Sequence, residues 1–258
     1  MVKKLLFLLM ILAMPLAQAG TLLVAAASDL VYCIDELGAA FRKAEPGADI
    51  KVSTGASGNF FAQIKRGAPF DVFLSADMDY PRRLAQEGAA DPASLTPYAI
   101  GRLAVWTLDP RFDLGKGMRA FADPRLARVA IANPDVAPYG RAARAALVHH
   151  GVWAAVQGKL AIGENVAQAA QFVQTGNAQL GIVSLATVLS PRLKGVGRYY
   201  LVPENGIAPI EQGVVVTRHG KANPLAARFV QFLQTKAARD ILQRSGFGPP
   251  RAPAGASA

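Results

Sequence analysis

A single cysteine, Cys33, occurs among the 258 residues, so the chain cannot form an internal disulfide. After residue 16, no apolar run is long enough to cross a membrane. The three histidines form no His-x-x-x-His pair, and there is no cysteine cluster to suggest a metal site. A Gly-x-Ser-x-Gly motif is also absent, as is any repeat at solenoid spacing. The chain is therefore expected to be globular, and its composition of 52% hydrophobic and 18% charged residues agrees with this.

Positive charge is in excess, with 28 Lys and Arg residues against 18 Asp and Glu residues. The net charge is +10, or +8 if Lys3 and Lys4 are removed with the N-terminus. The basic residues are scattered, and no run exceeds a pair such as Lys65-Arg66. Aromatic residues do not alternate with them along a stripe, which argues against nucleic acid as a partner. We interpret the basic residues as solvated surface side chains that also attract anions at long range.

The N-terminal 19 residues have the pattern of a cleavable signal peptide. Lys3-Lys4 forms a basic region, residues 5–16 form an apolar run too short to span a bilayer, and Ala17-Gln18-Ala19 is a cleavage signal. We expect cleavage after Ala19, which leaves 239 residues of an exported, soluble protein. That length suits two modest domains or one large domain.

Beyond the signal peptide, short apolar strands alternate with amphipathic helices, which predicts an α/β fold with mainly parallel sheets. Residues 99–108 read as one long strand, and the segment 203–206 separates two later strands. We interpret these two places as crossings between domains. The expected division is a discontinuous domain I, residues 20–98 and 206–258, and a domain II, residues 99–205. The Arg, Ala, Pro, Gly and Ser composition of residues 251–258 predicts a disordered tail.

Four strand-to-helix junctions carry small residues or residues that expose the backbone; they lie at Ser28, Ser57, Tyr139-Gly140 and Val166. Ser28 follows an apolar strand in N-cap position, with Asp29 in the first turn of the next helix. Ser57 holds the equivalent place in a small-residue turn after the second strand. The simplest interpretation of each junction is an ordinary capped helix that binds nothing.

The recurrence of these junctions favours a binding site. Ligands of α/β sheets bind beyond the carboxyl ends of the strands, next to helix N-termini. A helix N-terminus offers an anion free N–H groups and a positive dipole end. Because two junctions fall in each domain, a cleft between the domains would bring all four together. They supply hydroxyl and backbone N–H donors without Lys or Arg, which suits a fully ionised oxyanion.

Six segments are together specific for one family: Ala25-Ala26-Ala27-Ser28, Gly55-Ala56-Ser57-Gly58, 67–77, 133–140, Glu164-Asn165-Val166 and Leu180-Gly181-Ile182-Val183. In them the chain resembles the periplasmic molybdate-binding proteins of ABC transporters, and the resemblance covers nearly all of the mature sequence. It implies a two-domain type II periplasmic-binding-protein fold with the ligand cleft between the domains. It also implies a monomer without cofactor or catalytic activity, which captures molybdate or tungstate for an ABC permease in the inner membrane.

The resemblance also implies roles for individual residues. Ser28 and Ser57 match serines that give hydroxyl and backbone N–H groups to the molybdate oxyanion. Tyr139 and Val166 match positions that give backbone N–H groups. We carry over only the backbone N–H of Asp29, because a carboxylate facing a dianion would repel it, so its side chain is expected to point away.

The chain departs from enteric members of the family after the Gly-Ile-Val strand. Those members place a tyrosine there whose hydroxyl reaches the ligand, whereas this chain has Ser184, whose side chain is too short. The Tyr139 hydroxyl is a candidate to replace that contact.

Two alternatives to molybdate binding remain open. Another tetrahedral oxyanion, such as sulfate, suits the same donors, and only cavity size would discriminate. A secreted serine hydrolase would use Ser28 or Ser57 as nucleophile and need His149, His150 or His219 as base, and these histidines look solvated.

Overall fold

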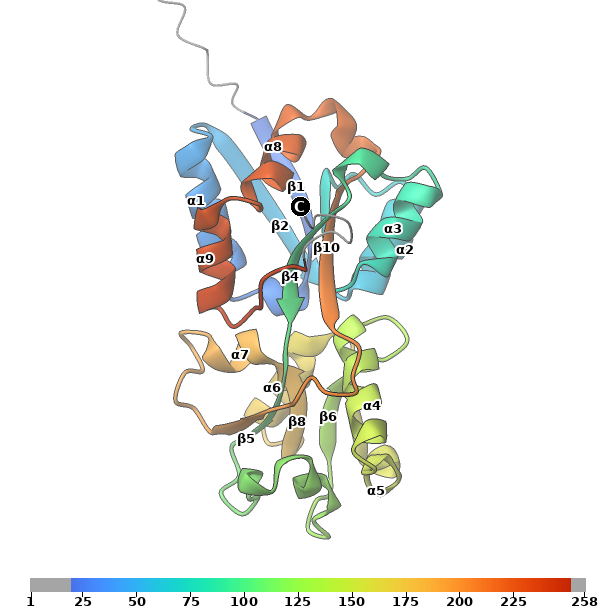
Figure 1. Ribbon diagram of the computed structural model, residues 1–258, viewed down its shortest axis with the longest axis vertical. Helices are drawn as coiled ribbons and strands as arrows, with labels where there is room; N and C mark the ends of the chain where they lie inside the picture. The colour runs from blue at the N-terminus through green and yellow to red at the C-terminus, as the bar shows by residue number, and fades with distance from the viewer. Residues whose placement is uncertain (1–19, 252–258) are drawn as a thin grey trace, which may run out of the picture.

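The computed structural model describes residues 20–251. The expected signal peptide, and all but the first residue of the expected tail at 251–258, lie outside these residues. Figure 1 shows two lobes stacked along the long axis of the molecule, joined by extended segments near the middle. Among the described residues, no helix is both long enough and apolar enough to cross a membrane.

The upper lobe in Figure 1 is domain I, built on a five-stranded sheet in the order β2-β1-β3-β10-β4. Its strands are β1 (Gly20–Ala27), β2 (Ala48–Gly55), β3 (Val72–Ser75), β4 (Thr96–Gly101) and β10 (Ile210–Val216). The strands β1, β2 and β3 are parallel, whereas β10 runs antiparallel to β3 and β4. The predicted α/β class is therefore confirmed, although the sheet is mixed.

Helices cover both faces of this sheet: α1 (Ile34–Ala44), α2 (Ser57–Lys65), α3 (Asp79–Gln86), α8 (Pro224–Phe232) and α9 (Lys236–Arg244). On one face, Phe41 packs edge-on against Phe229 and Phe232. On the other face, Phe60 packs against Phe73 and Phe70. These two apolar layers hold the carboxyl ends of the first three strands in a fixed relation.

Domain II, the lower lobe, repeats this arrangement with the strand order β7-β6-β8-β5-β9. Its strands are β5 (Leu103–Thr107), β6 (Val129–Ala132), β7 (Leu160–Gly163), β8 (Leu180–Ser184) and β9 (Arg198–Leu201). Its helices are α4 (Pro138–His149), α5 (Trp153–Val156), α6 (Val166–Gln174) and α7 (Leu185–Leu189). Short 3-10 helices complete the chain: η1 (Ser28–Leu30), η2 (Pro92–Ser94), η3 (Leu114–Ala122), η4 (Gln157–Lys159) and η5 (His219–Ala222).

The crossing between the domains differs from the one expected. The single strand predicted over 99–108 is two strands that belong to different sheets. The strand β4 still pairs with β10 at Gly101, so the first crossing is at Arg102 and not before Ala99. Sequence patterning missed the break because both strands are apolar and only one residue separates them.

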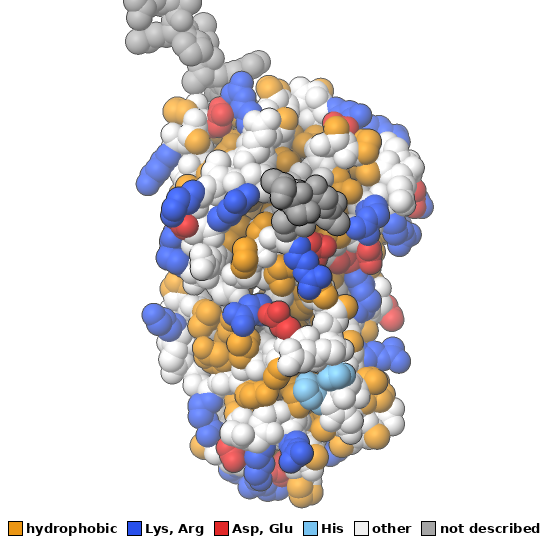
Figure 2. Space-filling view, viewed as in Figure 1, with side chains coloured by type: hydrophobic (Ala, Val, Ile, Leu, Met, Phe, Trp, Pro, Cys, Tyr) orange, Lys and Arg blue, Asp and Glu red, His pale blue; other side chains and the backbone are white. Residues whose placement is uncertain are grey.

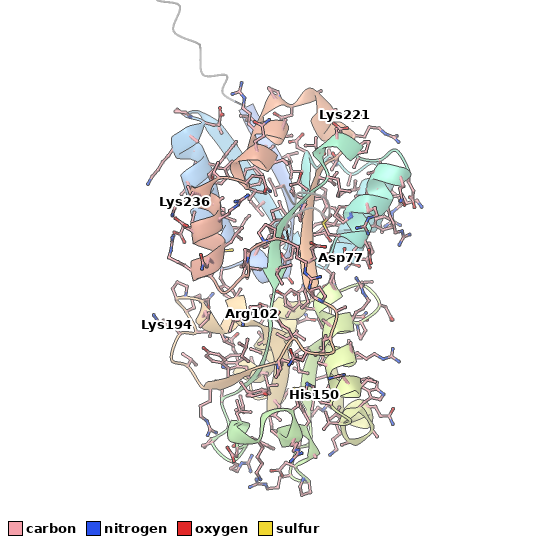
Figure 3. The ribbon with its side chains drawn as sticks, in the orientation of Figure 1. Asp77, Arg102, His150, Lys194, Lys221 and Lys236 are labelled. Atoms are coloured by element: carbon pink, nitrogen blue, oxygen red, sulfur yellow. The ribbon has the colours of Figure 1, made fainter. Side chains whose placement is uncertain are left out.

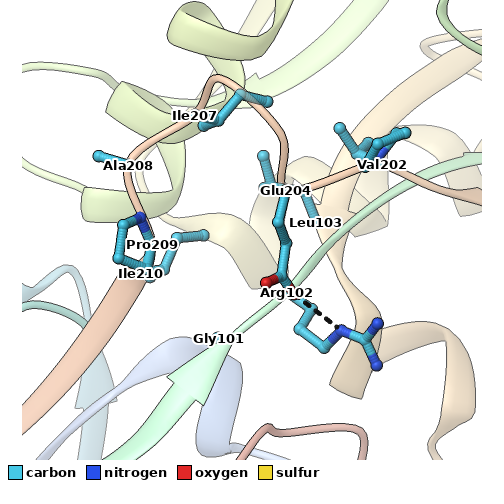
Figure 4. Close-up of a pocket in the computed structure, with 10 residues that line it drawn as sticks. Gly101, Arg102, Leu103, Val202, Glu204, Ile207, Ala208, Pro209 and Ile210 are labelled. Carbon is cyan, nitrogen blue, oxygen red and sulfur yellow. Dashed lines mark ion pairs between the residues drawn. The ribbon is translucent and has the colours of Figure 1, made fainter. Parts of the chain in front are cut away.

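The second crossing runs from the end of β9 to the start of β10 beside the first. Figure 4 shows the small hollow between the two crossing segments, where Arg102 of the first faces Glu204 of the second. Their side chains form an ion pair, with Arg102 Nε 3.3 Å from Glu204 Oε1. The two segments together connect the sheets and bring their carboxyl-end junctions face to face.

Candidate anion-binding site

All five candidate residues line one cavity between the two domains. Its walls are formed by Ala27, Ser28, Asp29, Gly55, Ala56, Ser57, Ala76, Ala137, Pro138, Tyr139 and Val166. The first seven belong to domain I and the last four to domain II. Its free volume of about 10 Å³ is close to the room that one water molecule needs, so the cavity excludes a chain or a ring.

The two serines do not have the helix positions expected of them. Ser28 opens the 3-10 helix η1, and α1 begins only at Ile34, so Ser28 caps no α-helix. Ser57 is the first residue of α2, whose N-cap is Ala56. Neither serine makes a capping hydrogen bond with its side chain, and both are buried.

The Ser57 hydroxyl is oriented by the turn that follows β3. Its Oγ accepts a hydrogen bond from the Ala76 N–H at 3.0 Å. A hydroxyl has one proton to donate as well as two lone pairs, so this bond leaves the proton available to a ligand. Domain I thus presents the Ser57 hydroxyl in an orientation set by neighbouring backbone.

Domain II presents backbone donors at two helix starts. In α4, Pro138 is the first helical residue and has no N–H, so Tyr139 carries the first N–H of that helix. In α6, the Asn165 side chain caps Ala167 and Gln168 and leaves the Val166 N–H outside the cap. The first N–H groups of a helix have no intrahelical acceptor, so these two are available to an anion.

Behind the cavity lies a buried polar network centred on Gln212. Its amide nitrogen donates to Asp29 Oδ2 and lies 3.4 Å from the Tyr139 hydroxyl oxygen. Its amide oxygen accepts from the Tyr98 hydroxyl at 2.6 Å. Tyr139 belongs to domain II and the other three to domain I, so the network spans the domain boundary.

Sequence reasoning missed Gln212 and Tyr98. The available signal was a glutamine inside the apolar strand 210–216, because a polar residue in a buried strand needs a partner. A register irregularity at Gln212 and Gly213 in the pairing of β10 with β4 accompanies this side chain, as bulges near functional sites often do.

The carboxyl of Asp29 is fully buried, with Oδ2 bound to Gln212 and Oδ1 without a hydrogen-bond partner among the described residues. Burial raises the pKa of this carboxyl from 3.8 to about 6, and hydrogen bonds from Gln212 and Tyr139 oppose the rise. Burial likewise raises the pKa of Tyr139 well above its ordinary value. The site therefore disfavours negative charge on its own residues.

The Tyr139 hydroxyl faces this network. The hydroxyl oxygen occupies the place that a Cβ atom would take at Gly101, so the Tyr139 side chain packs against the end of β4. Ser184 is absent from the cavity wall, and its Oγ instead caps α7, a helix that the sequence did not predict. That hydroxyl is also 2.8 Å from Thr187 Oγ1.

No Lys, Arg or His of the described residues lines the cavity. Residues 20–251 also hold no group of three His, Cys, Asp or Glu side chains that could bind a metal ion. The histidines proposed as a catalytic base lie elsewhere, at the far end of α4 and beside Asp71 at the opposite end of the domain I sheet. The arrangement can bind an oxyanion through neutral donors, and none of the three histidines lies next to either serine.

Comparison with known proteins agrees with this site. A sequence profile described as "bacterial extracellular solute-binding protein" matches residues 22–248. A molybdate-binding protein of Rhodobacter capsulatus is 38% identical over 240 residues, which cover 93% of this chain and 92% of that protein. One from Azotobacter vinelandii is 37% identical and covers 90% of this chain and 91% of its own length.

Among solved structures, a periplasmic molybdate-binding protein of Azotobacter vinelandii superimposes with a TM-score of 0.83 at 32% identity. The match covers 89% of this chain and 100% of that structure. Since the profile and the relatives span both domains and the cavity between them, the chain belongs to the family of bacterial extracellular solute-binding proteins.

Proposed function

We propose that this chain captures molybdate, and also tungstate, in the periplasm and delivers it to an ABC permease of the inner membrane. The single observation that supports this most strongly is the cavity between the domains, into which four junctions direct neutral donors. The names of the relatives agree with this function. The chain is a binding protein and not an enzyme.

We assign the donors as follows. Ser28 and Ser57 each give a hydroxyl and a backbone N–H, and Tyr139 and Val166 each give a backbone N–H. Asp29 contributes only its backbone N–H, since its carboxyl is held by Gln212. Hydrogen bonds to a charged acceptor contribute roughly 1.5–3 kcal/mol each, so a few of them suffice for tight binding without a countercharge.

The excess positive charge has a separate role. On the face in Figure 2, Lys and Arg side chains are spread over both domains and do not form one continuous patch. Such a distribution attracts anions at long range but does not select among them. It also gives no reason to propose nucleic acid as a partner, and we propose that the protein acts as a monomer.

The second candidate ligand is sulfate, which is also a tetrahedral dianion and would satisfy the same donors. Molybdate and tungstate have longer metal–oxygen bonds than the sulfur–oxygen bonds of sulfate, so cavity size would discriminate between them. We favour molybdate because the relatives above 35% identity are molybdate-binding proteins.

Calorimetric titration of residues 20–258 with molybdate, tungstate, sulfate and phosphate tests the proposal. Molybdate and tungstate are expected to bind at least tenfold more tightly than sulfate, and phosphate most weakly. The same titrations at low and moderate ionic strength should give similar Kd values, because the donors are neutral. If sulfate binds more tightly than molybdate, then sulfate is the ligand. A Kd that rises steeply with salt would contradict the neutral donor set.

A further inference from the structure

An ion pair between the domains lies beside the cavity and not in it. Arg141, on α4 of domain II, forms an ion pair with Asp77, which follows β3 of domain I. Its Nη1 also donates to the Tyr80 hydroxyl at 3.3 Å, and its guanidinium lies over the Tyr80 ring at 5.4 Å from the centroid. Figure 3 places Asp77 at the lower edge of domain I, where the two lobes meet.

The pair lies between two surface hollows, next to the anion cavity. A hollow of about 240 Å³ shares Ala76 and Pro138 with the anion cavity and is also lined by Asp77 and Arg141. A second hollow, of about 300 Å³, is lined by the same ion pair together with Arg82, Arg83 and other residues of α3. The Asp77–Arg141 pair therefore lies where these two hollows meet, next to the wall of the anion cavity.

Hydrogen bonds within domain I orient the Asp77 side chain toward Arg141. The carboxylate Oδ1 accepts hydrogen bonds from Ser75 Oγ and from the Tyr80 N–H, each at 3.0 Å. These bonds direct Oδ2 toward Arg141. With the domains in contact, the Asp77 side chain is only 14% exposed, so Arg141 supplies a countercharge to a carboxylate that is largely shielded from water.

Other polar contacts across the boundary are weaker candidates for holding it. One is the long contact, 3.4 Å, from the Gln212 amide nitrogen to the Tyr139 hydroxyl oxygen. The Asn59 amide donates to Glu164 Oε1 at 2.9 Å, but this contact is exposed to solvent. The Gly58 N–H donates to the Val136 carbonyl at 2.8 Å, which is a neutral backbone contact. Within residues 20–251, only Arg141 combines a charged partner, a second hydrogen bond and an aromatic contact across this boundary.

We propose that the Arg141–Asp77 pair is a clasp that forms when the two domains close on the anion and must break before the anion leaves. In this role Arg141 is a positioning residue: it contacts the opposite domain and not the ligand, and it sets the release rate. The inference rests on the proposed function, since it assumes that an oxyanion occupies the neighbouring cavity.

The test compares Arg141→Gln with Arg144→Gln. Both variants remove one positive charge from α4, but Arg144 lies over the Trp153 ring within domain II, at 5.2 Å from the centroid. Association and dissociation rates of radiolabelled molybdate are measured for each variant, with unlabelled molybdate as the chase. We expect Arg141→Gln to raise the dissociation rate about tenfold, and Arg144→Gln to change it by less than about twofold.

The partner variant Asp77→Asn should give a similar rise, and the double variant should release molybdate no faster than the faster single variant. Equal reductions of the association rate in both arginine variants, with unchanged dissociation, would mean that Arg141 only attracts anions at long range. Additive effects in the double variant would also overturn the clasp.

Failure of the proposed function is distinguishable from failure of the clasp. If the wild type binds sulfate and not molybdate, the ligand is wrong, and the same rate comparison with labelled sulfate still tests the clasp. Thermal unfolding of each variant without ligand identifies any substitution that disturbs folding, and the Asp77→Asn and Arg141→Gln variants provide independent measurements of the same pair.

Discussion

The buried carboxyl of Asp29 allows a quantitative prediction for the substitution Asp29→Asn. Burial raises the pKa of Asp29 from 3.8 to about 6, so the folded protein holds this proton more tightly than the unfolded chain does. Between these two values the folded state binds more protons, and its stability therefore falls as the pH rises. A pKa shift of this size contributes roughly 3 kcal/mol to the free energy of unfolding at low pH, and this contribution is lost as the pH rises above 6.

Asparagine has nearly the same shape, can still accept from Gln212 and carries no charge at any pH. The stability of Asp29→Asn relative to wild type should thus increase by roughly 2.4 kcal/mol between pH 4 and pH 7. The substitution also adds a difference in stability that does not depend on pH, because the new amide group takes the place of the unpartnered Oδ1 and has its own cost of burial.

The assay is urea unfolding of the ligand-free protein at several pH values, followed by circular dichroism. Taking the difference between the variant and the wild type cancels the titration of the other carboxyl groups. Parallel stability curves for the two proteins from pH 4 to pH 7 would refute the reasoning, since they would mean that Asp29 titrates normally in the folded state.

The same group should make molybdate binding depend on pH. A dianion in the cavity repels a charged Asp29, so binding favours the protonated carboxyl and takes up a proton. The wild-type affinity is expected to fall as the pH rises from 6 to 8, whereas the affinity of Asp29→Asn should remain constant over that range. Calorimetry in two buffers of different ionisation enthalpy measures the proton uptake directly.

Three further predictions concern the cavity wall and residues close to it. Ser28→Ala and Ser57→Ala should each weaken molybdate binding by roughly 1.5–3 kcal/mol, about tenfold to a hundredfold in Kd. Ser184→Ala should change Kd by less than about twofold. It should instead lower thermal stability, because the Ser184 side chain caps α7. Tyr139→Phe should cost less binding than either serine variant, because its hydroxyl faces the network behind the cavity, and a loss equal to that of the serines would place the hydroxyl on the anion. Gly58→Ala should weaken binding of every oxyanion alike, since its Cβ would lie 2.8 Å from a carbonyl oxygen of the opposite domain; an unchanged Kd in calorimetry would contradict this.

Much of the fold and of the candidate site could be predicted from the sequence alone. Alternating apolar strands and amphipathic helices are local patterns, so the α/β class and most element positions followed from them. The small residues at Ser28 and Ser57, and the helix starts at Tyr139 and Val166, are local in the same sense. The structure brings all of them to one cavity, and their contact with the ligand remains a prediction.

Other features were decided only by tertiary structure, because they depend on residues far apart in the sequence. The environment of Asp29 is set by Gln212, 183 residues later, and no local pattern joins the two. The position of the Tyr139 hydroxyl depends on the absence of a side chain at Gly101, and the ion pair of Arg141 depends on Asp77 in the opposite domain. Hydrophobic periodicity and backbone propensity act over a few residues, whereas the pKa of a buried group and the contacts between domains depend on what the folded chain places around each side chain.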